Sequence, residues 1–173
     1  MAATYTSLLS SSWYWQWSKR MTKLAFFDVD GTLSVPVFPD GDRLGIGLTN
    51  DAWLDYCIAN PENGYHLCRP VPAAREYARK LLDNGARCYV LTTSTFSYET
   101  SAKEVFIQKH YPGLFEQVIA VSSNSLKIPV ILAMARHAGL DPDCCELIED
   151  TYTILLEADR QGIKATHIVS ITA

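Results

Sequence analysis

The chain has 173 residues, of which 48% are hydrophobic and 20% are charged, and its formal net charge is −4 at pH 7. This length is enough for one domain with its own core, and the mildly acidic balance offers no basic stripe of the kind that binds nucleic acid. The five cysteines have no Cys-x-x-Cys spacing, so we expect reduced, mostly buried thiols in a cytoplasmic protein that binds no nucleic acid.

Residues 1–20 differ from the rest of the chain because they are rich in serine and tryptophan and carry charge only at Lys19 and Arg20. They lack the ordered parts of a signal peptide, and polar residues interrupt them too often for a membrane span. We therefore expect an N-terminal extension of open role on a domain that spans 21–173, with no membrane partner. Two alternatives stay open for its aromatic side chains. They pack over the domain, or they pack against a second subunit of a homo-oligomer.

The first strand is expected at residues 23–28, where an apolar run leads into the segment Asp28-Val29-Asp30-Gly31-Thr32. Because alternate strand residues point to the same face, Asp28 and Asp30 are predicted to share one side. One carboxylate can then accept a phosphoryl group as a nucleophile while the other moves protons. Gly31 permits a tight turn, and the hydroxyl of the following threonine can brace it. The alternative is an Asx-type turn that only closes a buried strand.

After this segment, short apolar runs alternate with longer amphipathic runs, and each longer run ends at a glycine or proline. This alternation favours an α/β fold with a three-layer, Rossmann-like parallel sheet and crossover helices. Right-handed crossovers bring the C-terminal ends of all strands to one edge, where open sheets bind ligands. We predict strands at 23–28, 87–92, 117–122, 146–150 and 165–170, helices at 71–84, 98–110, 127–138 and 151–161, and an insertion at about 34–69 with one helix at 50–59.

Polar side chains follow the second and third of these strands. Thr92, Thr93 and Ser94 end the second strand, and their hydroxyls can hold a phosphoryl oxygen without adding charge. The alternative for them is an ordinary Ser/Thr turn. Lys127 opens the helix after the third strand, so its ammonium can reach the same edge and neutralise both a carboxylate and a phosphate. The alternative for Lys127 is a merely solvated side chain.

Two acids, Glu149 and Asp150, follow the apolar run of the fourth strand. Carboxylates at the end of a buried strand are costly unless a positive group meets them. Mg²⁺ is suited to this place because it takes oxygen ligands and bridges to substrate phosphate. Asp28, the backbone carbonyl of Asp30 and Asp150 would supply its protein ligands. The alternative is a surface acid pair that caps the next helix.

These segments resemble, in the same order, the four motifs of the haloacid dehalogenase superfamily of phosphatases and phosphotransferases, over about residues 23–170. The stretch from Lys127 to Lys164 is most similar to the subfamily IA branch, which contains phosphoglycolate phosphatase-like and β-phosphoglucomutase-like members. An aspartate at position 30 argues against the dehalogenases of the superfamily. The segments similar to the four motifs are Asp28-Val29-Asp30-Gly31-Thr32, Thr92, Lys127 and Glu149-Asp150.

The resemblance implies a role for each of these residues. Asp28 is expected to be the nucleophile and Asp30 the acid/base. Thr92 and Thr93 are expected to bind the phosphoryl group, and Lys127 to bind it and stabilise its charge. The expected ligands of Mg²⁺ are Asp28, Asp30, Glu149 and Asp150.

This chain differs from the branch in two places. Residues 34–69 are shorter than the usual helical cap, so we expect a small, reduced cap and a site that is open or completed by another subunit. Ile154 and Leu155 stand where members of the branch often have a polar or acidic residue that supports the metal. The candidate substrate-reading residues of the insertion are Arg43, His66 and Arg69.

Together these features predict a catalytic domain at 21–173 that acts as a Mg²⁺-dependent phosphatase. Its expected substrate is a small phosphorylated metabolite, hydrolysed through an aspartyl-phosphate on Asp28. Two alternatives stay open. One is a phosphotransferase or mutase of the same superfamily, and the other is a non-catalytic domain of this fold that binds phosphate or metal without turnover.

Overall fold

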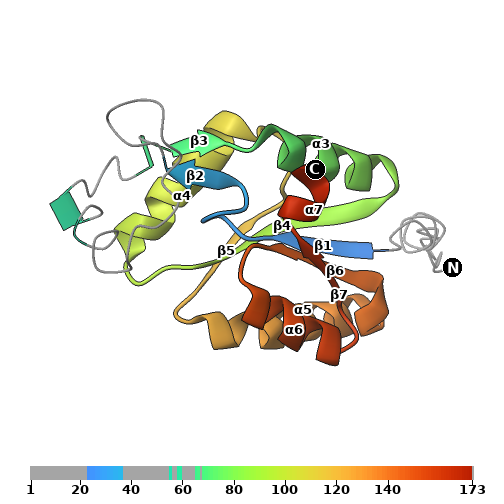
Figure 1. The fold of residues 1–173 in the computed structure, drawn as a ribbon. Coiled ribbons are helices and arrows are strands. Elements are labelled where there is room, and N and C mark those ends of the chain that lie inside the picture. Colours follow the sequence, from blue (N-terminus) through green and yellow to red (C-terminus); the bar gives the residue numbers. More distant parts are fainter. Residues whose placement is uncertain (1–22, 37–54, 56–57, 60–64, 67, 173) are drawn as a thin grey trace, which may run out of the picture.

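The computed structural model describes residues 23–36, 55, 58–59, 65–66 and 68–172. The N-terminal extension at 1–20, Arg43 and most of the helix expected at 50–59 lie outside the described residues. Figure 1 shows a central sheet with helices above and below it. Within the described ranges, no helix combines the length and the apolar character that a membrane crossing requires.

A five-stranded parallel sheet lies at the centre, with the strand order β5-β4-β1-β6-β7. The first strand of the chain is the middle one and pairs with β4 on one side and β6 on the other. This arrangement confirms the predicted α/β fold with a Rossmann-like parallel sheet. The strands are β1 (Lys23–Phe27), β4 (Ala86–Thr93), β5 (Val118–Val121), β6 (Cys145–Glu149) and β7 (Lys164–His167).

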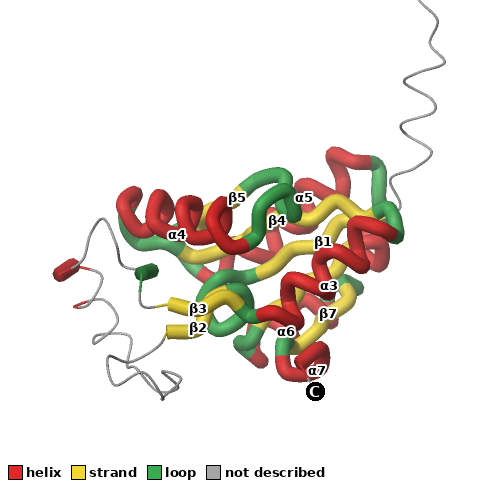
Figure 2. Tube along the Cα trace, turned by 90° about the horizontal axis from the view of Figure 1, so that it is seen from above, coloured by secondary structure: helices red, strands yellow, loops and turns green. Residues whose placement is uncertain are grey.

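Helices cover both faces of this sheet and complete three layers (Figures 1 and 2). Phe27 packs in the cluster that includes residues of α3 and α4, whereas Phe26 packs in the cluster that includes residues of α5 and α6. Adjacent residues of β1 thus face opposite layers, as strand geometry requires. The helices are α3 (Pro72–Asp83), α4 (Ser97–His110), α5 (Lys127–Ala138), α6 (Tyr152–Arg160) and the short α7 (Val169–Thr172), with 3₁₀ turns η1 (Asn124–Leu126) and η2 (Pro142–Cys144).

The sequence signals for these elements have direct counterparts in the structure. Residues 24–27 of β1 are all buried, because a parallel strand covered on both faces needs a continuous apolar run. Helix α5 ends at Gly139, whose φ of 68° gives the left-handed C-cap that glycine adopts without strain. The four described cysteines are free, as expected for reduced thiols.

The strand predicted at 165–170 is wrong in its second half. Strand β7 ends at His167, and Val169–Thr172 forms the helix α7. The register explains the difference, because His167 is opposite Glu149, the last residue of β6. An edge strand that has run past its single neighbour has no partner for further backbone hydrogen bonds, so the chain turns away.

A small antiparallel pair, which the sequence did not predict, closes the neck of the insertion. β2 (Ser34–Pro36) pairs with β3 (Cys68–Pro70), apart from the main sheet (Figure 2). The phenol of Tyr111 locks this neck, since it donates to the carbonyl oxygen of Leu33 at 2.5 Å and accepts from the N–H of Val71 at 2.9 Å. Three-residue strands that contain proline carry too little periodicity to be recognised in a sequence.

Candidate active site

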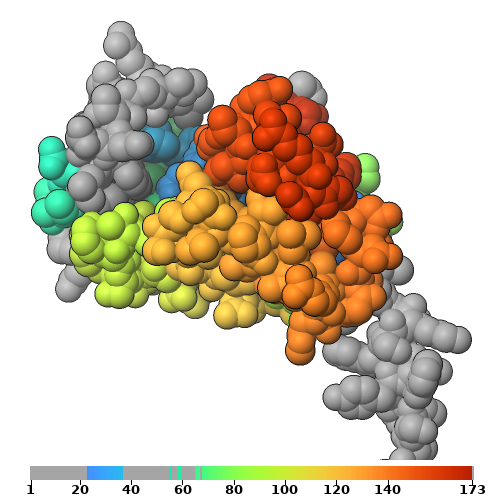
Figure 3. Space-filling view, turned by 90° about the horizontal axis from the view of Figure 1, so that it is seen from below, coloured from blue at the N-terminus to red at the C-terminus, as the bar shows by residue number. Residues whose placement is uncertain are grey.

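The predicted site residues lie around the C-terminal end of β1. Strands β4 and β6 flank β1, so the polar residues that end these three strands converge there. In the space-filling view, the blue atoms of the segment 23–36 reach the surface beside the orange and red segments of the second half of the chain (Figure 3). The C-terminal edge predicted for parallel strands with right-handed crossovers is therefore where the candidate side chains meet.

The turn after β1 differs from the expected extension of the strand. Strand β1 ends at Phe27, one residue before Asp28, although the N–H of Asp28 still donates to Ile148 at 3.0 Å. The carbonyl of Val29 accepts from three following N–H groups, which closes a tight turn. Asp30 lies in this turn, so the alternation of strand side chains does not decide where its carboxylate points.

Two features of this turn involve Gly31 and Thr32. Gly31 has a φ of 79°, and a Cβ atom there would lie 2.0 Å from Oδ2 of Asp150. Only glycine therefore allows the carboxylate of Asp150 to rest against the turn. The Thr32 hydroxyl does not brace the turn as expected: it is buried, and it has no hydrogen-bond partner within the described part of the chain. Backbone N–H groups that donate to the carbonyl oxygen of Val29 close the turn instead.

Lys127 is the central cation of the site. Its side chain is 2% exposed, and its Nζ lies 2.8 Å from Oδ1 of Asp28 and 2.7 Å from Oε2 of Glu149. The 3₁₀ turn η1 and the start of α5 carry the lysine to the sheet edge. Burial acts to lower the pKa of Lys127, but the two carboxylates outweigh it and raise the pKa above its ordinary value. Lys127 is therefore a fixed ammonium, bonded to the expected nucleophile.

The carboxylates around Lys127 outnumber it. Burial raises the pKa of Asp28 despite the opposing effect of Lys127. Burial and the charge of Asp28 raise the pKa of Glu149 to about 8. Burial is the main cause of both shifts, and the repulsion between neighbouring carboxylates adds to it.

Asp28, Glu149 and Asp150 form an acidic cluster that can hold a metal ion. Each offers a carboxylate oxygen, and these oxygens lie within 4.8 Å of one another. Hard oxygen donors of this kind suit Mg²⁺, and Asp150 is exposed while the other two are buried. The side chain of Asp30 is outside this cluster, so a ligand role for Asp30 falls to its backbone carbonyl and stays a prediction.

Asp30 is bonded to a different lysine. Its Oδ2 lies 2.8 Å from Nζ of Lys103, and its Oδ1 accepts from the phenol of Tyr65 at 2.5 Å. The two expected catalytic aspartates thus have separate cations, Lys127 for Asp28 and Lys103 for Asp30. Separate partners suit separate chemical tasks for two neighbouring carboxylates.

The hydroxyl residues of β4 lie beside this second lysine. Thr92 is buried, and its Oγ1 accepts from Nζ of Lys103 at 3.1 Å. Thr93 donates to the side chain of Asn124 at 2.5 Å, which ties β4 to the turn before Lys127. The hydroxyl of Ser94 is buried without a hydrogen-bond partner among the described residues, so it can serve a ligand at this edge.

Lys103 and Tyr65 are the candidate site residues that sequence reasoning missed. Lys103 lies inside α4, far from any strand end, and Tyr65 lies at the base of the insertion. One signal for Lys103 was present, since Phe106 and Ile107 follow it at helical spacings of three and four and are buried. A lysine on the apolar side of a helix needs a buried partner. No comparable signal marks Tyr65.

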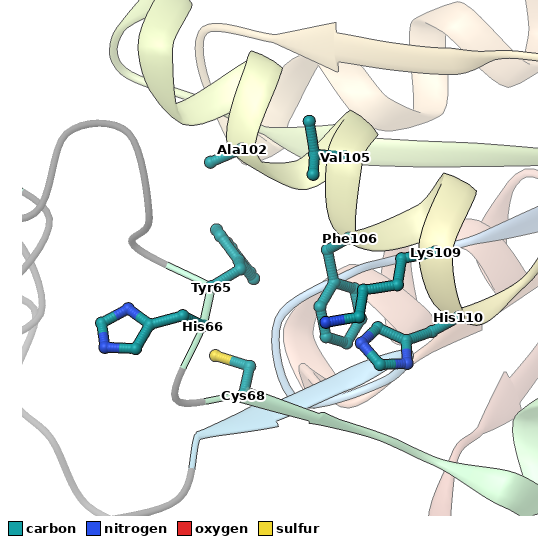
Figure 4. A pocket seen from close by; sticks show the side chains of 8 residues that line it. All are labelled: Tyr65, His66, Cys68, Ala102, Val105, Phe106, Lys109 and His110. Carbon is teal, nitrogen blue, oxygen red and sulfur yellow. The ribbon is translucent and has the colours of Figure 1, made fainter.

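Two of the three substrate-reading candidates of the insertion, Arg69 and His66, lie within the described residues, and Arg43 does not. Arg69 is exposed on β3, and His66 is exposed next to Tyr65. His66 lines a small cavity of about 120 Å³ between the base of the insertion and α4 (Figure 4). The other lining residues are Tyr65, Cys68, Ala102, Val105, Phe106, Lys109 and His110.

Ile154 and Leu155 are buried in α6. Ile154 packs in the core cluster that α5 and α6 share, so its position belongs to the helix–sheet interface. A polar side chain at this place would face the core of this chain, and the apolar departure from the branch is therefore a packing feature.

No family model matches this chain, and no curated protein matches it in sequence. Solved structures do. A haloacid dehalogenase-like family hydrolase from Streptococcus pneumoniae is similar over 89% of this chain and 90% of its own, with a TM-score of 0.56 and 20% identity. An uncharacterized protein from Listeria monocytogenes is similar over 82% of this chain and 75% of its own, with a TM-score of 0.54 and 15% identity.

A third similar structure carries ligands. A HAD family enzyme from Bacteroides thetaiotaomicron, in complex with magnesium and inorganic phosphate, is similar over 82% of this chain and 91% of its own. Its TM-score is 0.50 and its identity is 14%. Similarity at these identities establishes the fold, while assignment to the subfamily IA branch stays a prediction. This chain therefore has the haloacid dehalogenase-like fold.

Proposed function

We propose that this protein is a Mg²⁺-dependent phosphatase that hydrolyses a phosphomonoester through an aspartyl-phosphate on Asp28. The observation that carries the proposal is the buried ammonium of Lys127, which bonds Asp28 and Glu149 beside the exposed carboxylate of Asp150. A cation against a carboxylate at a ligand-binding sheet edge suits attack on an anionic phosphoryl group. Lys127 offsets the repulsion between the two anions.

In the first half of the reaction, an oxygen of Asp28 attacks phosphorus and the bond from phosphorus to the leaving oxygen breaks. Asp30 donates its proton to the leaving oxygen, so the product departs as an alcohol. Thr92, Thr93 and Lys127 would bind the phosphoryl oxygens. The side chain of Asp30 is 43% exposed, which gives a leaving group access to it.

In the second half, Asp30, now ionised, takes a proton from a water molecule. The water oxygen attacks phosphorus, the bond from phosphorus to Asp28 breaks, and inorganic phosphate leaves. The proton returns Asp30 to its starting form. One residue thus serves as acid and then as base, and one carboxylate is regenerated.

Asp28, Asp150 and Glu149, with the backbone carbonyl of Asp30, are the residues that would hold Mg²⁺. Three carboxylates around one ammonium leave an excess of negative charge that a divalent cation matches. When bound, the ion supplies positive charge that keeps these carboxylates ionised and offsets the charge of the phosphoryl oxygens. The similar enzyme from Bacteroides thetaiotaomicron was solved in complex with magnesium and inorganic phosphate, which supports Mg²⁺ and a phosphoryl group as ligands of this site.

The test is phosphate release from a panel of sugar phosphates, nucleotides and p-nitrophenyl phosphate, measured with Mg²⁺ and with EDTA. We expect release from at least one compound that depends on Mg²⁺ and is lost in Asp28→Asn. Isomerisation of a sugar phosphate without phosphate release would identify a mutase instead. Binding of phosphate or Mg²⁺ without turnover of any compound would overturn the proposal in favour of a binding domain.

A further inference from the structure

Lys103 is a buried cation beside the site. Its side chain is 0% exposed, and its ammonium lies 2.8 Å from Oδ2 of Asp30 and 3.0 Å from Oε1 of Glu99. It also donates to the hydroxyl of Thr92 at 3.1 Å and to the carbonyl oxygen of Thr93 at 2.5 Å. An ammonium whose three hydrogens are shared among these four acceptors has little freedom to move. It joins the expected acid/base directly to the expected phosphate-binding threonine.

Asp30 is held on both of its oxygens. Lys103 bonds Oδ2, and the phenol of Tyr65 donates to Oδ1 at 2.5 Å. The carboxylate is still 43% exposed, so it is held in one orientation without being sealed from solvent. Each carboxylate oxygen has a second lone pair, which leaves Asp30 able to carry and pass a proton while both contacts persist.

Tyr65 is fixed by helix α4. It is 5% exposed, its ring packs against Phe106 with centroids 5.8 Å apart, and Nζ of Lys103 lies 6.0 Å from its ring centroid. Figure 4 shows Tyr65 and Phe106 at the same hollow between the insertion and α4. The phenol therefore reaches Asp30 from a rigid base, although it comes from the insertion and not from the sheet.

We propose that Lys103 and Tyr65 are positioning residues that hold the Asp30 carboxylate in the orientation for proton transfer to the leaving oxygen, with Lys103 coupling Asp30 to Thr92. This inference rests on the proposed function. Proton transfer depends steeply on the placement of the acid. Asp30 lies just before Gly31 in the turn after β1, outside the strands of the main sheet, so the sheet does not orient its side chain. Contacts from α4 and from the insertion supply that orientation.

Neither residue contacts the phosphoryl group: Tyr65 acts through Asp30, and Lys103 acts through Asp30 and Thr92. This predicts a specific kinetic signature. An ester with a poor leaving group needs the proton from Asp30, whereas an activated aryl ester does not. Loss of positioning therefore lowers kcat for the first ester much more than for the second. A merely structural defect would lower both rates together.

The experiment compares phenyl phosphate with p-nitrophenyl phosphate, two esters of similar shape whose leaving groups differ in their need for a proton. Tyr65→Phe is expected to lower kcat about 10-fold for phenyl phosphate and less than about threefold for p-nitrophenyl phosphate, with little change in KM. The matched control is Tyr77→Phe, which removes a phenol that donates to the carboxylate of Glu146 at 2.7 Å. The control should leave the ratio of the two rates unchanged.

Lys103→Met is the second variant, and it is expected to show the same selective loss together with a higher KM for both esters. If this variant does not fold, Tyr65→Phe decides the question alone. Equal losses on both esters, or an unchanged rate on phenyl phosphate in Tyr65→Phe, would overturn the positioning role while wild-type activity upholds the phosphatase. No phosphate release by the wild type from these esters or from any compound of the wider panel would overturn both.

Discussion

The two ends of strand β6 carry two buried glutamates in opposite electrostatic states. Glu146 and Glu149 are both 0% exposed and are three residues apart. Burial alone would raise the pKa of Glu146, but hydrogen bonds from several neighbours outweigh it and lower the pKa to about 2. Burial and the charge of Asp28 raise the pKa of Glu149 to about 8. The groups that bond Glu146 are Lys23, Tyr77, Lys164 and Thr166.

The two ends of β6 differ in the number of cations per carboxylate. Two lysines and two hydroxyls surround the single carboxylate of Glu146, so its charge is compensated and all its contacts are made. At the other end, Lys127 serves both Asp28 and Glu149, with Asp150 nearby. A saturated cluster stabilises the fold, whereas a cluster with excess negative charge attracts a cation and an electrophilic ligand.

The largest effect is expected from Asp28→Asn, at the unsaturated end. The amide keeps the shape of the side chain and loses the nucleophile, so turnover should fall by about 10³-fold or more. Phosphate release measures the loss, and circular dichroism with a melting curve checks that the fold is intact. Activity near that of the wild type would rule out a covalent intermediate on Asp28.

Changing each glutamate of β6 to glutamine separates the roles of the two ends of the strand. Glu149→Gln weakens the hold on Lys127 and removes a charge from the acidic cluster, so activity should fall by about 10- to 100-fold. Glu146→Gln should leave kcat within about twofold of wild type, because its partners lie at the other end of the strand. Similar activity losses in the two variants would contradict the division between the ends.

The order of the two variants should be reversed for stability, with the larger loss in Glu146→Gln. Glu146→Gln replaces a buried carboxylate with an uncharged amide, so two lysines lose their anionic partner. The free energy of unfolding should therefore fall by about 2 kcal/mol. Urea denaturation of both variants measures this difference. A larger loss in Glu149→Gln than in Glu146→Gln would mean that the acidic cluster, and not the saturated one, holds the fold together.

The pH dependence of stability sharpens the assignment of Glu146. Its folded pKa of about 2 lies below the ordinary value of 4.5, so the folded state binds fewer protons than the unfolded state between these limits. Its stabilising contribution is complete above pH about 4.5 and is lost as the pH falls toward about 2. The stability difference between wild type and Glu146→Gln should therefore shrink over this range in urea titrations. A constant difference down to pH about 2 would exclude the charged form as its source.

The smallest effect is the response of the melting temperature to Mg²⁺. An ion that binds only the folded state at a few times its Kd adds about 1 kcal/mol, which corresponds to about 2 to 4 °C for a chain of this size. We expect this increase in the wild type and its loss in Asp150→Asn, which removes the exposed carboxylate of the cluster. An equal increase in both proteins would place the ion elsewhere.

Local sequence determined the elements that stand behind the site. Apolar runs ending in polar residues predicted β1, β4 and β6, and glycine and proline stops predicted the ends of the helices, with α5 at its observed bounds. Parallel strands joined by right-handed crossovers then placed Asp28, Lys127 and Asp150 at one edge. The elements could be predicted because side-chain periodicity depends on residues close together in the chain. The common edge could be predicted because crossovers between parallel strands are right-handed.

Only the tertiary structure decided which charged groups meet. Lys103 from the middle of α4 and Tyr65 from the insertion bond Asp30, although 73 and 35 residues separate them from it in the printed numbering. Glu146 and Glu149 look alike in the sequence, and their opposite states depend on which lysines reach each one across the sheet. Electrostatic partners are chosen by distance in space, which packing of the layers sets, and so the protonation and the role of each buried acid follow from the fold.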